Sequence, residues 1–154
     1  MVKFHTNIGE DVLISGEFGE SLLAYRLVKK NMHVIMARTA GFDLVVKDIN
    51  GKTFSKKRNI AISVKTQTRN SWSKNLKKDY KKLKKISKIW GFKPYFAFIT
   101  RHNIIVFPAE LSKNKKIQTP TGNVSVSLLK KLEQAKNNQI IIYKYEIEDI
   151  KNRK

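Results

Sequence analysis

Two charged side chains, Asp43 and Lys65, stand in neighbouring apolar segments of the chain. Asp43 belongs to Gly-Phe-Asp-Leu-Val-Val (residues 41–46), and Lys65 belongs to Ile-Ser-Val-Lys-Thr (residues 62–66). Hydrolysis of a phosphodiester bond needs a hard cation held by oxygen ligands, which polarises the phosphate and lowers the pKa of a bound water. Asp43 could hold that cation, and Lys65 could orient the water or neutralise charge that develops on the phosphate.

The segment that carries Lys65 offers further polar groups. Side chains alternate along a strand, so Ser63, Lys65 and Gln67 should share one face, which the Asp43 carboxylate could meet. Glu20 lies in a preceding helical segment and could supply a second carboxylate. A lysine in a strand is also common at a solvated sheet edge, so these residue types alone leave both interpretations open.

The elements that must position these residues alternate between helical and strand-like patterns. Apolar periodicity predicts helices over residues 17–30, 74–90 and 126–135, and strands over 33–38, 42–49, 58–66, 94–100, 103–107 and 139–145. Asn50-Gly51 indicates a hairpin between the second and third strands. Since no long linker divides the chain, we expect one α/β domain over residues 1–154, with a helix leading into a mixed sheet.

The helix expected over residues 74–90 carries much of the positive charge. Eight of the fifteen residues from Lys74 to Lys88 are lysine, set around an apolar stripe of Leu76, Tyr80, Leu83, Ile86 and Trp90. Lysines that contact phosphates position a nucleic-acid backbone without reading its sequence. The residues expected to do so here are Lys56, Lys57, Arg58, Arg69, Lys74, Lys77, Lys78 and Lys81. Trp72 could either stack on an unpaired base or form a lid on the core.

The composition favours an anionic partner. Lysine and arginine number 32 against 12 acids, for a net charge of +20 on 154 residues. Such charge opposes compaction by self-repulsion, and neutralising phosphates releases counterions, which drives binding to nucleic acids. A proteome rich in lysine could also produce this composition. The absence of cysteine excludes disulfides and thiolate zinc sites. With no membrane-length apolar run and no signal-peptide pattern, we expect a cytoplasmic protein with no membrane partner.

Taken in order, three short motifs resemble those of the PD-(D/E)XK nuclease superfamily. They are residues 16–20 (Gly-Glu-Phe-Gly-Glu), which open a helix, and the two segments around Asp43 and Lys65. The chain is most similar to archaeal Holliday-junction-resolvase-like and related endonuclease families. The resemblance covers about residues 16–111 and implies a restriction-endonuclease-like fold, a central mixed sheet flanked by helices in the order α-β-β-β-α-β. The C-terminal extension, about residues 124–149, lies outside it.

The resemblance also implies roles for individual residues. Glu20 matches the helix glutamate, Asp43 the metal-binding aspartate and Lys65 the catalytic lysine, with Mg²⁺ or Mn²⁺ as cofactor. Ser63 occupies the place of the second acid, and serine is a poor ligand for magnesium. Gln67, on the face of the lysine, could substitute for that acid in part.

Three hypotheses about function follow. The first is a metal-dependent endonuclease that hydrolyses DNA, duplex or branched, and acts as a homodimer so that two cuts are made symmetrically. The second is a DNA-binding protein that kept the nuclease fold and lost catalysis with the second acid. The third is a basic RNA-binding protein unrelated to nucleases.

Overall fold

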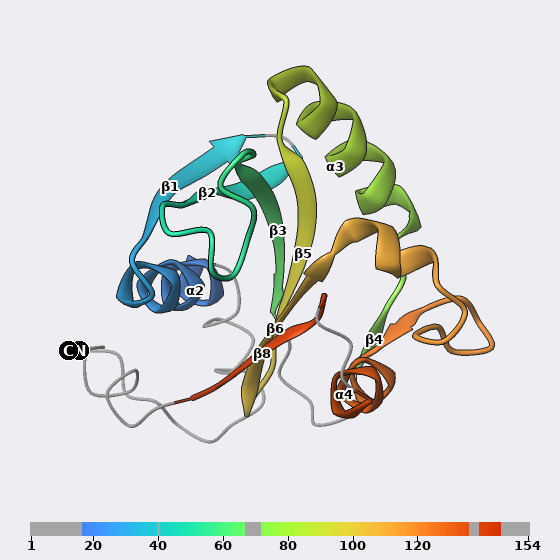
Figure 1. Cartoon of the computed structure of the whole chain (residues 1–154). Coiled ribbons are helices and arrows are strands. Elements are labelled where there is room, and N and C mark those ends of the chain that lie inside the picture. The colour runs from blue at the N-terminus through green and yellow to red at the C-terminus, as the bar shows by residue number, and fades with distance from the viewer. Residues whose placement is uncertain (1–16, 40, 67–71, 136–138, 146–154) are drawn as a thin grey trace.

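A six-stranded mixed sheet organises the chain (Figure 1). The structure is a computed structural model that describes residues 17–39, 41–66, 72–135 and 139–145. The strands lie in the order β1-β2-β3-β5-β6-β8. Their bounds are β1 Met32–Thr39, β2 Phe42–Asp48, β3 Ile60–Thr66, β5 Lys93–Ile99, β6 Asn103–Pro108 and β8 Ile141–Lys144. Among the described strand pairs β3 and β5 are parallel and the others are antiparallel.

Helices α2 (Glu17–Lys29) and α3 (Lys77–Trp90) cover opposite faces of this sheet. Leucines of α2 pack with the even-numbered residues of β3, such as Ile62, whereas α3 packs over the face that carries Ala61. Alternation along β3 therefore places the side chains of Ser63 and Lys65 on the α3 face. The predicted order of helices and strands is confirmed.

The polypeptide that joins β3 to β5 crosses over the sheet through α3. Gly91 ends this helix in the left-handed conformation, with φ of 74°, and Phe92 N–H donates to Ser87 O at 2.8 Å. A side chain at Gly91 would be strained there, which is why glycine commonly follows a helix. The chain leaves β3 at its carboxyl end and must return to the start of the parallel strand β5. Helix α3 makes this return, so its first turn lies near the carboxyl end of β3.

Two details of α3 differ from the prediction. The helix begins at Lys77 rather than Lys74, because Ser73–Lys74 form a short strand, β4, that pairs with β7 (Val124–Ser125). Trp90, expected in the apolar stripe, is 62% exposed and stacks on Phe92 with ring centroids 6.2 Å apart. It lies in the last turn, beyond the part of the helix that the sheet covers.

The connection between β2 and β3 folds around one buried carboxylate. The side chain of Asp48 accepts hydrogen bonds from the backbone N–H groups of Gly51, Thr53 and Phe54, at 3.0, 2.8 and 2.7 Å. Burial raises the pKa of Asp48, but these backbone hydrogen bonds outweigh it, and the pKa lies below its usual value. The predicted hairpin is thus present with a longer connection, residues 49–59.

The C-terminal part of the chain joins both the sheet and α3. After β6 come a 3-10 turn, η1 (Ala109–Lys113), then β7 and helix α4 (Val126–Gln134). Val126 N–H donates to Trp72 O at 3.1 Å, which ties the start of α4 to the segment before α3. β8 then pairs with β6 and forms one edge of the described sheet.

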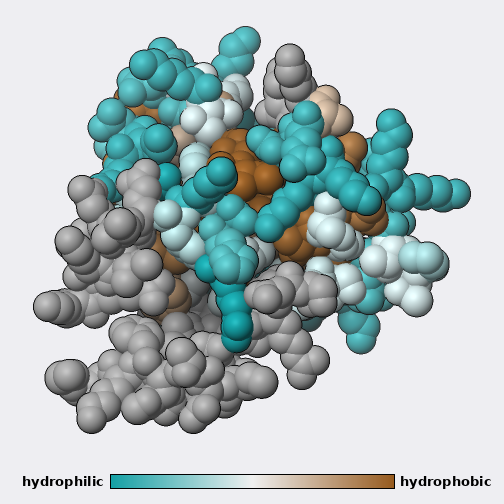
Figure 2. Space-filling model, turned by 90° about the horizontal axis from the view of Figure 1, so that it is seen from below, coloured by the Kyte–Doolittle hydropathy of each residue, from teal (hydrophilic) through white to brown (hydrophobic). Residues whose placement is uncertain are grey.

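On the face that Figure 2 shows, most of the coloured side chains are hydrophilic, with apolar areas between them. Among the exposed apolar residues, Ile35 and Met36 lie on β1, the other edge of the described sheet, and are 66% and 38% exposed. In the ranges that the structure describes, no helix has the length and apolar character needed to cross a membrane.

Candidate active site

The carboxylate of Asp43 is anchored on β3. Val64 N–H donates to Asp43 Oδ2 at 2.7 Å. The antiparallel register pairs Leu44 with Ile62, so one further step along both strands places Asp43 across from Ser63. The sheet therefore places Asp43 across from Ser63, and the backbone bond at Val64 orients one carboxylate oxygen; the role of Asp43 in binding a metal stays a prediction.

Lys65 forms an ion pair that the sequence analysis did not anticipate. Its Nζ lies 3.1 Å from Asp79 Oδ2, and the two side chains are 18% and 33% exposed. Asp79 stands in the first turn of α3, where a negative charge is favourable to the helix dipole. It is the only acid from Lys74 to Lys88, and this isolated acid in a lysine-rich helix was the signal available in the sequence.

A second lysine lies beside this ion pair. Burial lowers the pKa of Lys74, the positive charge of Lys65 lowers it further, and the negative charge of Asp79 raises it in part. The resulting pKa of Lys74 is below its ordinary value. Lys65, Lys74 and Asp79 thus form one charged cluster at the carboxyl end of β3.

Ser63 lies on β3 directly before the two residues that the carboxylates contact, Val64 and Lys65. Its side chain is 6% exposed, and it offers a neutral hydroxyl where the resemblance expects an acid. Within the described ranges no group of three or more His, Cys, Asp or Glu residues could hold a metal ion. Asp43 accepts a hydrogen bond from the backbone of Val64, and Asp79 pairs with the side-chain amine of Lys65.

The helix that carries Glu20, α2, approaches β3 from the face of the sheet opposite Ser63 and Lys65. The residue before Glu20, Gly19, lies so close to Thr66 that a Cβ at Gly19 would stand 2.2 Å from Thr66 Oγ1. The first turn of α2 therefore meets the same end of β3, and a role for Glu20 in binding a metal stays a prediction. Gln67 and Arg69 lie outside the described residues.

The predicted basic residues are divided between the two ends of α3. Lys77, Lys78 and Lys81 are exposed in its first half, and two of them border a groove of about 540 Å³. Arg58 lies at the other end, where its Nε donates to Gly91 O at 3.1 Å. There it borders a groove of about 600 Å³, whose described charged residues are Arg58, Lys84, Lys88, Lys93, Lys113 and Glu110. Lys56 and Lys57 are exposed in the loop before Arg58.

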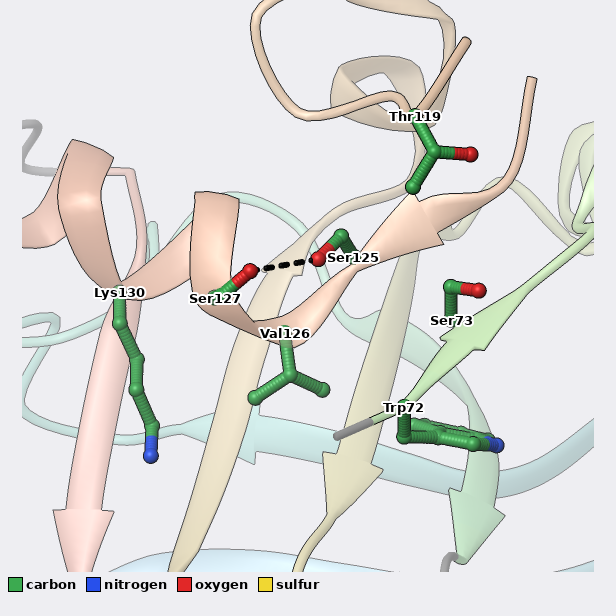
Figure 3. A pocket seen from close by; sticks show the side chains of 7 residues that line it. All are labelled: Trp72, Ser73, Thr119, Ser125, Val126, Ser127 and Lys130. Carbon is green, nitrogen blue, oxygen red and sulfur yellow. Dashed lines mark hydrogen bonds between the residues drawn. The ribbon is translucent and has the colours of Figure 1, made fainter. Parts of the chain in front are cut away.

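Trp72 packs on the core beside Lys65. Its ring meets that of Phe98 edge to face, with centroids 4.6 Å apart, and Phe98 is the β5 residue paired with Lys65. Trp72 is half-buried and also lines a small pocket (Figure 3). Of the two interpretations that the sequence allowed for Trp72, packing on the core is therefore observed. Part of the ring also borders the pocket.

A comparison with solved structures identifies the fold. The chain is similar to Hjc, a Holliday junction resolvase from the archaeal hyperthermophile Archaeoglobus fulgidus, with a TM-score of 0.53 and 20% sequence identity. The match covers 73% of this chain and 90% of that chain. The chain has a restriction-endonuclease-like fold. No protein-family model and no curated protein matches the sequence.

The restriction-endonuclease-like fold agrees with the fold that the resemblance implied. At 20% identity the likeness concerns the fold, and it does not transfer the role of any residue. The function must be argued from the site itself, that is, from Asp43, Ser63, Lys65 and Asp79.

Proposed function

We propose that this protein is a divalent-metal-dependent endonuclease that hydrolyses phosphodiester bonds in DNA. The observation that carries the proposal is the Asp43 carboxylate bound to the β3 backbone beside Lys65, in a restriction-endonuclease-like fold. A carboxylate can help to hold a metal ion, and a lysine on the adjacent strand can stabilise the negative charge that develops on the phosphate. The net charge of +20 supplies attraction for a polyanion.

The oxygen donors at the site suit magnesium or manganese. Asp43 would be one ligand, Asp79 offers a carboxylate close to Lys65, and Glu20 stays the second ligand that the sequence predicts; within the described residues these acids do not form a three-residue metal-binding group. Mg²⁺ keeps several waters and is commonly held by one or two carboxylates, so few protein ligands suffice. When bound, the ion would polarise the phosphate and lower the pKa of a water molecule. Because Ser63 is neutral, the carboxylates and bound waters would have to hold the ion.

The protein's own groups would orient the reaction. Val64 N–H holds one oxygen of Asp43, which fixes the direction of the carboxylate. The ion pair with Asp79 fixes the amine of Lys65, whose charge would stabilise the negative charge that develops on the phosphate. The lysines of α3 would hold the flanking backbone without reading its sequence.

Branched DNA is the substrate that the similarity to a Holliday junction resolvase favours. A symmetric pair of copies would present two equivalent sites, so that two strands could be cut at related positions. Basic grooves at both ends of α3 support contact with an extended length of backbone rather than a single phosphate.

A cleavage assay on plasmid, linear duplex and four-way junction, each with Mg²⁺, Mn²⁺ or EDTA, tests this function. The decisive variant is Asp43→Asn, because an amide oxygen can still accept the hydrogen bond from Val64 while the charge is lost. We expect metal-dependent cleavage by the wild type, none by the variant, and equal DNA affinity for both. Cleavage by Asp43→Asn at the wild-type rate would exclude Asp43 as the metal ligand.

A DNA-binding protein without catalysis is the second candidate. The observation that favours it is the buried, neutral Ser63 together with the ion pair that engages Lys65. Tight and salt-sensitive retention of DNA with no cleavage in either metal would support this candidate. A strong preference for single-stranded RNA over duplexes and junctions would support the RNA-binding hypothesis instead.

A further inference from the structure

A small pocket lies between the segment before α3 and the C-terminal extension (Figure 3). Its volume is about 320 Å³. Strands β4 and β7 form its framework by pairing Ser73 with Ser125. One wall is the ring of Trp72, and α4 contributes Ser127 and Lys130. The pocket therefore exists only because the C-terminal extension docks on this side of the sheet.

The pocket opens beside the candidate active site. Trp72 rests on Phe98, which is the cross-strand neighbour of Lys65. Lys74 follows Ser73 directly and lies close enough to Lys65 and Asp79 for both charges to act on its amine. Trp72 and Ser73 thus connect this pocket to the charged cluster of Lys65, Lys74 and Asp79.

The polar groups of the pocket are held in place by the fold. Ser125 is 9% exposed, and its Oγ lies 2.8 Å from Ser127 Oγ. Lys130 extends from α4, and its Nζ lies 3.0 Å from the side-chain oxygen of buried Asn103 when that amide is oriented to satisfy its hydrogen bonds. Thr119 adds a further hydroxyl. Fixed hydroxyls and a lysine can bind a phosphate or sugar, and an indole face can stack on a base.

The size of the pocket limits what it can hold. A volume of about 320 Å³ is near the lower end of the range for small-molecule sites. A base pair within a duplex cannot enter, because its partner strand and neighbouring pairs come with it. One nucleotide that is not base-paired can enter, and it combines an aromatic ring with a negative charge.

We infer that this pocket binds a single unpaired nucleotide of the DNA strand that enters the candidate active site. The inference rests on the proposed function in taking DNA as the partner. It assigns the C-terminal extension a role in selecting DNA that has an unpaired base next to the bond that is cut. Trp72 stacks on the base, and Lys130 contacts its phosphate.

EDTA removes the metal that the proposed cleavage needs, so binding measured in EDTA tests the pocket independently of catalysis. The two probes are a blunt duplex and the same duplex with a single-stranded flap that carries 2-aminopurine at the first unpaired position. Trp90→Phe leaves Trp72 as the only tryptophan, so its fluorescence reports on the pocket. We expect the flapped duplex, and not the blunt one, to quench both Trp72 and 2-aminopurine.

Two variants and one matched control test the same pocket. Ser127→Phe fills it from an exposed position and should lower the preference for the flapped duplex about tenfold, the scale of one lost stacking contact. Lys130→Gln should lower that preference about fivefold by removing one phosphate contact. Lys131→Gln, exposed on the same helix, removes the same charge and should leave the preference unchanged.

The outcomes distinguish this inference from the proposed function. If the preference for the flap survives Ser127→Phe, or if Lys130→Gln and Lys131→Gln weaken both probes alike, the pocket does not bind the unpaired nucleotide, whether or not the protein cleaves DNA. If the preference is lost as expected but no metal supports cleavage, the pocket stands and the nuclease activity does not.

Discussion

At the scale of single residues, Asp79 is the acid that α3 adds to the site. Its carboxylate is 3.1 Å from Lys65 Nζ, while Ser63 provides no charge on the strand itself. An acid carried by α3 can contact the same lysine because the parallel crossover returns the first helical turn to the end of β3.

We expect Asp79→Asn to lower the single-turnover rate of DNA cleavage about 100-fold in Mg²⁺, since a fixed charge in an active site commonly contributes that much. DNA affinity should stay the same or rise, because one negative charge near the lysines is removed. Glu133→Gln, which neutralises an exposed acid on α4, is the control and should cleave at the wild-type rate. A normal rate for Asp79→Asn would show that the ion pair serves structure alone.

The site could be predicted only in part from the sequence. Asp43 and Lys65 stand out in the sequence because each interrupts an apolar strand, and the pairing of adjacent strands follows from the order of the elements. The contact of Asp79 depends on where α3 begins and which way its first turn faces. Tertiary packing sets that position. Periodicity therefore predicts the helix but not the contact between Asp79 and Lys65.

At the scale of the elements, the loop between β2 and β3 depends on the charge of Asp48. Because its folded pKa lies below the usual value, the carboxylate contributes stability above the pKa of the unfolded chain, about 4. That contribution is lost as the pH falls through the lower folded pKa.

Asp48→Asn should therefore lower the free energy of unfolding by about 1–3 kcal/mol at pH 7, because the amide cannot accept all three backbone bonds. Urea denaturation at pH 7, 5 and 3 should give a constant difference from wild type at the first two values and a smaller one at pH 3. Glu110→Gln, an exposed acid, is the control. A difference that grows on acidification would contradict the assigned direction of the pKa shift.

The contact between α2 and β3 makes a second prediction at this scale. Alanine normally stabilises a helix relative to glycine by about 1 kcal/mol. In Gly19→Ala the new Cβ would lie 2.2 Å from Thr66 Oγ1, so we expect destabilisation of about 1–3 kcal/mol instead. Thr66→Ala removes that oxygen and should restore part of the loss in the double variant. Thermal unfolding of the two single variants and the double variant measures the coupling, and additive effects would contradict it.

The elements themselves were largely predictable because their apolar periodicities are strong and their ends carry recognisable residues such as Gly91. The sequence pattern predicts a helix from Lys74, three residues before α3 begins at Lys77. Ser73 and Lys74 continue the helical pattern of the sequence, but they pair with Val124 and Ser125, about fifty positions later. A local pattern contains no information about so distant a partner.

At the scale of the whole molecule, the positive charge is arranged along α3. Basic residues border grooves at both ends of the helix, so a bound backbone that follows α3 would contact both. The salt dependence of binding then reports on how many of these contacts form, since each neutralised phosphate changes the slope of log K against log salt by about 0.9 for duplex DNA.

We expect Arg58→Gln/Lys88→Gln to reduce that slope by about 2, one contact for each residue. Lys115→Gln/Lys116→Gln lowers the net charge equally but changes exposed residues that line neither groove, and it should leave the slope nearly unchanged. Fluorescence anisotropy over a series of salt concentrations measures both. Equal slopes for the two double variants would show that DNA responds to total charge and not to the groove beside Gly91.

The positive charge of the molecule also opposes aggregation through the edge strand β1. Within the described chain β1 ends the sheet, and it exposes Ile35 and Met36 beside a row of backbone groups. Such an edge can accept a strand from another molecule and start aggregation. Mutual repulsion between copies at +20 opposes that encounter, and dissolved salt weakens the repulsion. We therefore expect that salt high enough to release the protein from DNA, its proposed partner, also favours adhesion between its copies.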